Sequence, residues 1–276
     1  MNPVAKRTIT ALTTATFVVI ALLYLPLAVV QIALVALVAL VQLEFLQIVS
    51  KKHETMPFIG IALGVALMAT SCYPIKMSPG FSMAHLLRYA PIAFCALFVF
   101  MWIRSLFGKF RSPLTAVGTT LLSVIYIPLM LLSFCKIPAV YGVKMLLFVV
   151  AIIKISDMGG FAFGLGSKKI FGDNHKMCPT ISPNKSWEGM FGSVFASCLI
   201  SCLFIPMTGF GLGKSLLLGA IAAIVGTFGD LVESRFKREC EVKDSATFMP
   251  AGLGGFLDMF DSLIFAPAVL FPLLAK

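Results

Sequence analysis

The feature that most constrains this chain of 276 residues is a succession of long, uninterrupted apolar runs. Hydrophobic residues make up 59% of the sequence and charged residues only 12%. A helix needs about 20 apolar residues to cross a hydrocarbon layer about 30 Å thick, where only helices and closed barrels satisfy their backbone groups. Because the runs are continuous rather than alternating, the sequence predicts an all-α integral membrane protein whose environment is the lipid bilayer.

Nine transmembrane helices can be drawn through these runs. The first two form one nearly unbroken run, which we divide at Pro26 because its length is about two bilayer crossings. The predicted ranges are 9–27, 29–49, 56–74, 85–103, 114–134, 139–156, 189–207, 214–233 and 258–275.

The basic residues give this arrangement an orientation. If the N-terminus is cytoplasmic, 15 of the 22 lysines and arginines fall in cytoplasmic segments and 4 in outer segments. This asymmetry follows the positive-inside rule, so we predict a cytoplasmic N-terminus and an outer C-terminus. The same rule explains the net charge of +10 without a nucleic-acid partner, because the bases occupy short loops between apolar runs.

The acidic residues are distributed unevenly along the chain. Only Glu44 and Glu54 precede residue 157, whereas ten acids lie between positions 157 and 261. In the nine-span arrangement, five of them end or begin spans at the cytoplasmic face: Asp157, Asp230, Glu233, Asp258 and Asp261. We therefore predict a membrane scaffold over 1–137 and a catalytic membrane half over 138–276, with its active site at the cytoplasmic face.

The stretch 229–262 concentrates seven acids and four bases in an otherwise apolar protein. Carboxylates hold divalent cations through oxygen ligands, and lysine and arginine neutralise phosphate oxygens, so the mixture suits a metal-phosphate substrate. Asp258 and Asp261 are three residues apart at a predicted helix start and project from one face, where they could grip a cation. The alternative is that both carboxylates only favour the positive end of the helix dipole.

This stretch resembles the signature of the phosphatidate cytidylyltransferases, also called CDP-diacylglycerol synthases. The pattern Ser-x-apolar-Lys-Arg-x4-Lys-Asp-x-small is matched by Ser234, Phe236, Lys237, Arg238, Lys243, Asp244 and Ala246. The family's later Pro, Gly-Gly and paired aspartates are matched by Pro250, Gly254, Gly255, Asp258 and Asp261. The sequence departs from the family at Leu253, where a His is usual, at Met259, where an Arg is usual, and by one extra residue between the proline and the glycines.

A second motif, Ile181-Ser-Pro-Asn-Lys-Ser-Trp-Glu-Gly189, lies in the predicted loop between the sixth and seventh spans. It resembles the family's Ser-Pro-x-Lys-Ser/Thr-Trp-Glu-Gly without departures. The hydroxyl and ammonium groups of Ser182, Lys185 and Ser186 can contact phosphates. The indole of Trp187 can stack or lie at the membrane interface, and Glu188 places a carboxylate at the start of a span. The alternative is a capped helix start with an interfacial Trp.

Three further features carry alternatives. Asp157 stands where the family has an aspartate followed by small and aromatic residues, and the Gly160 and Gly164 after it would let another helix pack closely. The bases of the signature are predicted to contact phosphates, although they could be ordinary positive-inside anchors. Lys237 lies on one helical face with Glu233, so a structural ion pair is a second alternative for it.

The residues alone reach as far as a cation-dependent phosphate site at a membrane surface. The resemblance implies transfer of CMP from CTP to phosphatidate in phospholipid biosynthesis, at the cytoplasmic face of the inner membrane. Three carboxylates brought to one membrane face repel one another, so we predict that Asp244, Asp258 and Asp261 act together as catalytic ligands of Mg²⁺, with a second cation and a homodimer left open. Lys243 completes the catalytic set, and substrate binding is assigned to Ser182, Lys185, Ser186, Trp187, Glu188, Lys237, Arg238, Gly254, Gly255, Asp157 and Asp230.

Two other functions remain open from the sequence. A polyprenol- or phytol-kinase-like enzyme would transfer the γ-phosphoryl group of a nucleotide to a lipid alcohol. An ion-coupled transporter also has carboxylates within the membrane, but they should lie near mid-membrane in repeated halves, whereas these lie at one face.

Overall fold

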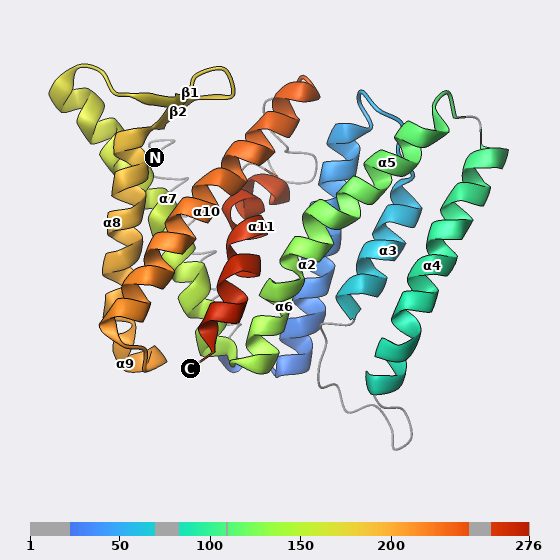
Figure 1. Cartoon of the computed structure of the whole chain (residues 1–276), viewed down its shortest axis with the longest axis horizontal. Coiled ribbons are helices and arrows are strands. Elements are labelled where there is room, and N and C mark those ends of the chain that lie inside the picture. The colour runs from blue at the N-terminus through green and yellow to red at the C-terminus, as the bar shows by residue number, and fades with distance from the viewer. Residues whose placement is uncertain (1–22, 70–82, 109, 243–254, 276) are drawn as a thin grey trace, which may run out of the picture. The chain divides into compact units, whose positions relative to one another are not determined.

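The computed structural model describes residues 23–69, 83–108, 110–242 and 255–275, and most of these residues are helical (Figure 1). The elements are α2 (Leu27–Val49), α3 (Pro57–Ala69), α4 (Met83–Phe107), α5 (Pro113–Val124), η1 (Ile125–Leu129), α6 (Met130–Val140), α7 (Val143–Phe171), β1 (Lys176–Cys178), β2 (Ser182–Ser186), α8 (Trp187–Leu203), α9 (Ile205–Thr208), α10 (Leu212–Glu239), α11 (Phe256–Leu270) and η2 (Phe271–Leu274). This is consistent with the predicted all-α membrane protein.

Within the described ranges, five helical segments are long and apolar enough to cross a membrane. They are Leu27–Val49, Pro113–Val140, Val143–Phe171, Leu212–Glu239 and Phe256–Leu274. Shorter apolar helices cover Pro57–Ala69, Cys95–Phe107 and Trp187–Leu203, so each predicted span after the first overlaps a described helix, although 70–74 of the third span lie outside the described residues. The first predicted span, 9–27, lies almost wholly outside the described residues, although α2 does begin directly after Pro26 as expected.

The segment from α5 to α6 is continuous and contains one π-helical stretch around Pro128. Proline has no backbone N–H and its ring displaces a carbonyl one turn earlier, which accounts for the wider turn there. The next helix, α7, is bounded by Gly142 and Gly172, whose φ values of 87° and 80° lie in the left-handed region. The helix continues beyond the predicted span 139–156 and past Asp157, because no proline or left-handed residue interrupts α7 before Gly172.

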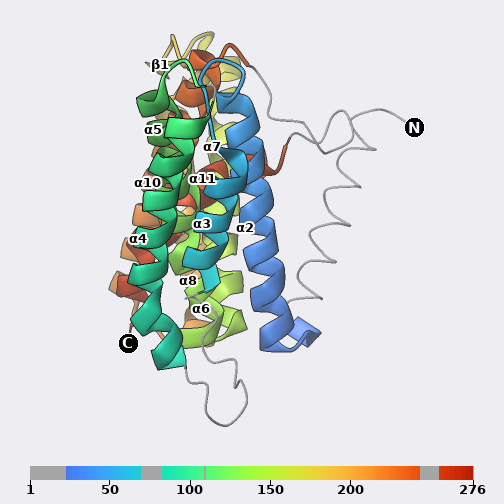
Figure 2. The same cartoon turned by 90° about the vertical axis from the view of Figure 1, so that its right-hand side faces the viewer.

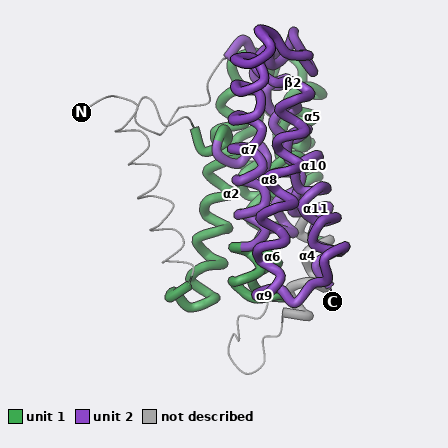
Figure 3. The backbone as a smooth tube through the Cα atoms, turned by 90° about the vertical axis from the view of Figure 1, so that its left-hand side faces the viewer, with its two compact units in different colours: residues 1–129, 135–147, 244–258 green, residues 130–134, 148–243, 259–276 purple. Residues whose placement is uncertain are grey.

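The chain forms two compact units (Figure 3). Unit 1 comprises 1–129, 135–147 and 244–258, and unit 2 comprises 130–134, 148–243 and 259–276. In unit 1, α3 packs against α2, α4 and α5, and these helices run alongside one another (Figure 2). The side-chain amide of Gln42 links three of them, because its Nε2 donates to the Gly60 carbonyl at 2.8 Å and to Ser123 Oγ at 3.2 Å.

Both acids of the first half accept hydrogen bonds from backbone amides at helix starts. The buried Glu44 accepts from the N–H of Leu257 at 2.8 Å, in the first turn of α11. Glu54 accepts from the N–H groups of Arg111 and Ser112, directly before α5, and these bonds hold the pKa of its carboxyl below the usual value. Helix starts have backbone donors without intrahelical partners, so these carboxylates have a structural explanation.

In unit 2, α8 and α10 lie side by side (Figure 1). Small residues permit the close approach: a Cβ added at Gly219 of α10 would lie 2.7 Å from Cys198 Cα of α8. Ser201 Oγ also donates to the Ser215 carbonyl at 2.7 Å, which joins the two helices by a hydrogen bond. On α7, a Cβ at Gly160 would lie 2.3 Å from Ser193 Oγ, so the predicted packing role of that glycine is confirmed.

The second motif lies partly on a two-stranded antiparallel hairpin rather than in an open loop. Strands β1 and β2 pair Lys176 with Ser186 and Cys178 with Ser182. The Trp187 N–H then donates to the His175 carbonyl at 2.9 Å, so the ladder continues to the first residue of α8. The hairpin therefore fixes the direction in which the motif enters α8.

Candidate functional site

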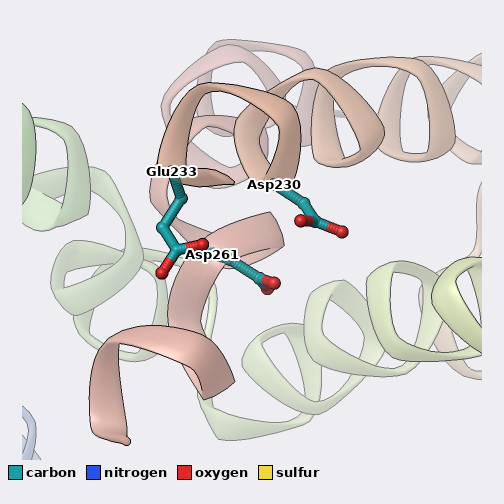
Figure 4. Close-up of side chains that lie close together, drawn as sticks. All are labelled: Asp230, Glu233 and Asp261. Carbon is teal, nitrogen blue, oxygen red and sulfur yellow. The ribbon is translucent and has the colours of Figure 1, made fainter. Parts of the chain in front are cut away.

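Three carboxylates from two helices gather in unit 2. Asp230 and Glu233 stand one turn apart on α10, and Asp261 reaches toward them from α11 (Figure 4). One carboxylate oxygen from each residue lies within 4.8 Å of the other two. Clustered carboxylates repel one another, and oxygen donors are the ligands that Mg²⁺ and Ca²⁺ prefer. The donor set therefore fits a hard divalent cation.

Each of these carboxylates is also close to a lysine. The Nζ of Lys185 lies 2.5 Å from an oxygen of Asp230, and that of Lys237 lies 2.8 Å from Glu233 Oε2. Asp261 Oδ1 lies 3.9 Å from a third ammonium group, on α7. For Lys237 the structure shows the ion pair that we considered as the alternative to phosphate contact.

A cavity of about 330 Å³ lies beside this cluster, among α7, the hairpin, α8 and α10. Its volume is within the range of small-molecule sites. Five residues assigned to substrate binding from the sequence line it together, namely Asp157, Ser182, Lys185, Ser186 and Asp230. Because Asp230 belongs to both the cavity and the acidic cluster, a phosphate in the cavity would lie close to a cation held by the cluster.

Lys185 lies on strand β2 of the hairpin, which places its side chain at this cavity. Its Nζ reaches from β2 to Asp230 and to the Thr227 carbonyl, which lies 3.2 Å away. Ser186 caps α8 by accepting from the Gly189 N–H at 3.1 Å, as the helix-start interpretation predicted. Arg238 Nε donates to the Ile181 carbonyl at 3.4 Å, so this signature arginine contacts the hairpin turn.

Glu188 belongs to the motif but contacts the residue before β1. Its Oε1 lies 2.7 Å from His175 Nδ1, and its carboxylate also accepts from the His175 N–H. These bonds lower the pKa of Glu188 to about 2 and raise the pKa of His175. The neighbouring Trp187 is 57% exposed, which matches the alternative of an interfacial indole.

The predicted metal set of Asp244, Asp258 and Asp261 is described only in part. Asp258 Oδ2 accepts from the Gly255 N–H at 2.9 Å, a contact that the helix-start alternative predicted. Asp261 lies in the acidic cluster. The other predicted residues, Lys243, Asp244 and Gly254, lie outside the described residues.

Two residues of the site were not among the sequence-based assignments. Glu233 was recognised only as a possible partner of Lys237, although its spacing of three from Asp230 was a signal for a shared ligand face. Lys154 lies in the predicted span 139–156 and was assigned no role. Its position one turn before Asp157, in an apolar run, was a signal for a paired charge.

Long apolar helices, with carboxylates, lysines and small residues around one cavity, define an all-α membrane protein with a site suited to a divalent cation and phosphate groups. The chain belongs to the cytidylyltransferase family, whose family model matches residues 5–275.

Relatives of the chain include proteins named phosphatidate cytidylyltransferase. The protein of Staphylococcus aureus (strain COL) is 36% identical over 165 residues, which is 59% of this chain and 61% of the relative. That of Staphylococcus epidermidis (strain ATCC 12228) is 35% identical over 166 residues, with the same coverage. That of Staphylococcus haemolyticus (strain JCSC1435) is 39% identical over 131 residues, 47% of this chain and 48% of the relative. The matched part thus spans less than two thirds of these relatives' length.

Proposed function

We propose that this protein is an enzyme that transfers CMP from CTP to phosphatidate, giving CDP-diacylglycerol and pyrophosphate in phospholipid biosynthesis. The observation that carries the proposal is the meeting of Lys185 with Asp230 at the edge of a cavity, beside the acidic cluster. Family membership and the printed name of the relatives support the same reaction.

In the proposed reaction, an oxygen of the lipid phosphate attacks the α-phosphorus of CTP, and the bond from that phosphorus to the bridging oxygen of pyrophosphate breaks. A phosphate monoester is largely ionised at neutral pH, so the attacking group needs no strong general base. Lys185 lines the cavity and would contact phosphate oxygens there. Ser182 and Ser186 bring hydroxyl groups to the same cavity.

Mg²⁺ is the proposed cofactor, and Asp230, Glu233 and Asp261 are the residues that would hold it. When bound, it would neutralise charge that develops on the transferring phosphoryl group. Asp244 and Asp258 of the sequence prediction remain candidates for a second cation.

Exchanging single carboxylates for amides distinguishes between the two candidate sets of metal ligands, namely the predicted set (Asp244, Asp258 and Asp261) and the observed cluster (Asp230, Glu233 and Asp261). Asp261→Asn changes both sets and should reduce turnover by about 10²-fold or more, the size of a lost transition-state charge contact. Glu233→Gln should have a similar effect if the observed cluster holds the ion, whereas Asp258→Asn should then cost only a few-fold. A large loss in Asp258→Asn together with wild-type turnover in Glu233→Gln would contradict the observed cluster as the metal site.

The reaction itself can be tested with purified protein, phosphatidate, Mg²⁺ and CTP labelled at either its α- or its γ-phosphate. Label from the α-position should enter the lipid product, and label from the γ-position should appear in pyrophosphate. Transfer of the γ-label to a polyprenol or phytol would instead support the kinase-like alternative. Lys185→Met should reduce product formation, whereas Lys214→Met, at the other end of α10 from Asp230, serves as a matched control.

We also propose the nine-span topology, with the N-terminus and active site at the cytoplasmic face of the inner membrane, a scaffold over 1–137 and a catalytic half over 138–276. The asymmetry of the basic residues supports it. Cysteine-accessibility labelling should find positions next to Lys185 and Lys243 cytoplasmic and positions next to Lys214 outside. Labelling of positions near Lys185 and Lys214 from the same side would contradict it.

A further inference from the structure

Lys154 lies in an apolar stretch of α7, where its ammonium group meets the helix that carries Asp261. Its Nζ lies 2.9 Å from the Met259 carbonyl, 3.0 Å from Ser262 Oγ, 3.4 Å from Asp157 Oδ2 and 3.9 Å from Asp261 Oδ1. All five residues belong to unit 2. Four oxygens thus surround one amine.

These contacts explain how a lysine is tolerated inside a candidate membrane span. A charged side chain there is costly unless it is paired. An ammonium group has three donors, and a carbonyl, a hydroxyl and a carboxylate are all within reach of them. Ser262 Oγ also donates to Asp157 Oδ2 at 2.8 Å, so the network closes between α7 and α11. The position of the ammonium is therefore well defined.

The charges around the cavity and cluster nearly balance. The four carboxylates and three ammonium groups joined by these contacts are Asp157, Asp230, Glu233, Asp261, Lys154, Lys185 and Lys237. This set carries a net charge of −1, and it would carry −2 if Lys154 were neutral. Coulomb repulsion between an ammonium and a divalent cation a few ångströms apart exceeds thermal energy even at an effective dielectric constant of about 20.

We propose that Lys154 is a positioning residue that serves as the built-in counter-ion of Asp261. Its ammonium group lies 3.9 Å from Asp261 Oδ1, and its charge lowers the affinity of the acidic cluster for a divalent cation. The inference rests on the proposed function, because it takes Asp230, Glu233 and Asp261 as the residues that hold the ion. It assigns a role to a residue that lies outside the two family motifs.

The test is a titration of the purified full-length protein with Mn²⁺ at pH 8 without substrates, followed by electron paramagnetic resonance of the free ion. Mn²⁺ takes the same octahedral oxygen sites as Mg²⁺. Lys154→Met keeps the length of the side chain and removes its charge, so the dissociation constant should fall about tenfold or more. Lys154→Arg keeps the charge and should stay close to wild type.

Lys214→Met is the matched control for removing a lysine from this unit. Its ammonium contacts the Ala275 carbonyl and lies 4.5 Å from the centroid of the Phe210 ring, so the dissociation constant for Mn²⁺ should not change. Lys154→Gln can still donate to the Met259 carbonyl and provides a second neutral variant, with the same expected tightening, if Lys154→Met does not fold.

An unchanged or weaker affinity for Mn²⁺ in the neutral variants at position 154 would overturn the role of Lys154. A wild-type protein that does not bind Mn²⁺ would overturn the metal site of the proposed function itself. The two failures are therefore distinguishable in one set of titrations. A second expected result is that the Mg²⁺ concentration for half-maximal turnover falls in Lys154→Met and stays unchanged in Lys154→Arg.

Discussion

Replacing Gly219 with alanine is expected to force α8 and α10 apart. The new Cβ would lie 2.7 Å from Cys198 Cα, 2.8 Å from Cys198 N and 2.9 Å from the Ser197 carbonyl oxygen. All three atoms belong to the backbone of α8, so no side-chain rotation relieves the overlap. The helices would have to separate by several tenths of an ångström, because non-bonded carbon atoms pack at about 3.5–4.0 Å.

The expected cost is about 1–3 kcal/mol of stability, the typical range for overpacking a close contact. Function should suffer as well, because the cavity is lined from both helices: Ser193 comes from α8, and Thr227 and Asp230 come from α10. A wider gap would lengthen the reach of Lys185 to Asp230. We therefore expect turnover to fall together with stability.

The assay is unfolding in SDS, followed by far-ultraviolet circular dichroism, combined with turnover in mild detergent. Gly213→Ala is the matched control, since it lies on the same helix and an added Cβ meets no atom within 4 Å. It should unfold at the wild-type SDS concentration or slightly above it, because alanine favours helix more than glycine does. Wild-type stability and turnover in Gly219→Ala would refute the close backbone contact between α8 and α10.

Three further perturbations address the hairpin and the start of α11. Lys185→Met should reduce kcat/KM for CTP by about 10²-fold, as expected for a lost charge contact to phosphate; unchanged steady-state kinetics would contradict its place in the site. The raised pKa of His175 means that its bond to Glu188 stabilises the folded state fully below the ordinary histidine pKa. That contribution is lost as pH rises through the raised value, so amide exchange in the hairpin should accelerate with pH beyond its intrinsic dependence in wild type but not in His175→Ala. Glu44→Ala should cost about 1–3 kcal/mol in SDS unfolding, because a buried backbone N–H loses its acceptor. Glu44→Gln retains an acceptor and should cost less. Equal stability of Glu44→Ala and wild type would contradict a stabilising hydrogen bond from the Leu257 N–H to Glu44.

The helices could be predicted from the sequence because apolar runs of bilayer length leave the backbone few alternatives. Part of the site could be predicted as well, because the motif lysine at position 185 and Asp230 were both assigned to substrate binding and do meet. The contacts of Lys154 could not be predicted, because this lysine and its acceptor at Met259 are 105 residues apart in the sequence. Nor could the hairpin, because strands of three and five residues in a polar segment show no usable alternation.

The hairpin determines which changes in chain length the site should tolerate. The register of the hairpin shifts between its two paired positions, so removing one residue between Ser182 and Lys185 would change the place at which the lysine side chain enters the cavity. The turn at 179–181 lies outside the ladder, and extra residues there would leave the pairing of Lys176 with Ser186 intact. A short peptide tag or a fluorescent label for following substrate binding would therefore belong in that turn, a few residues from the cavity it reports on.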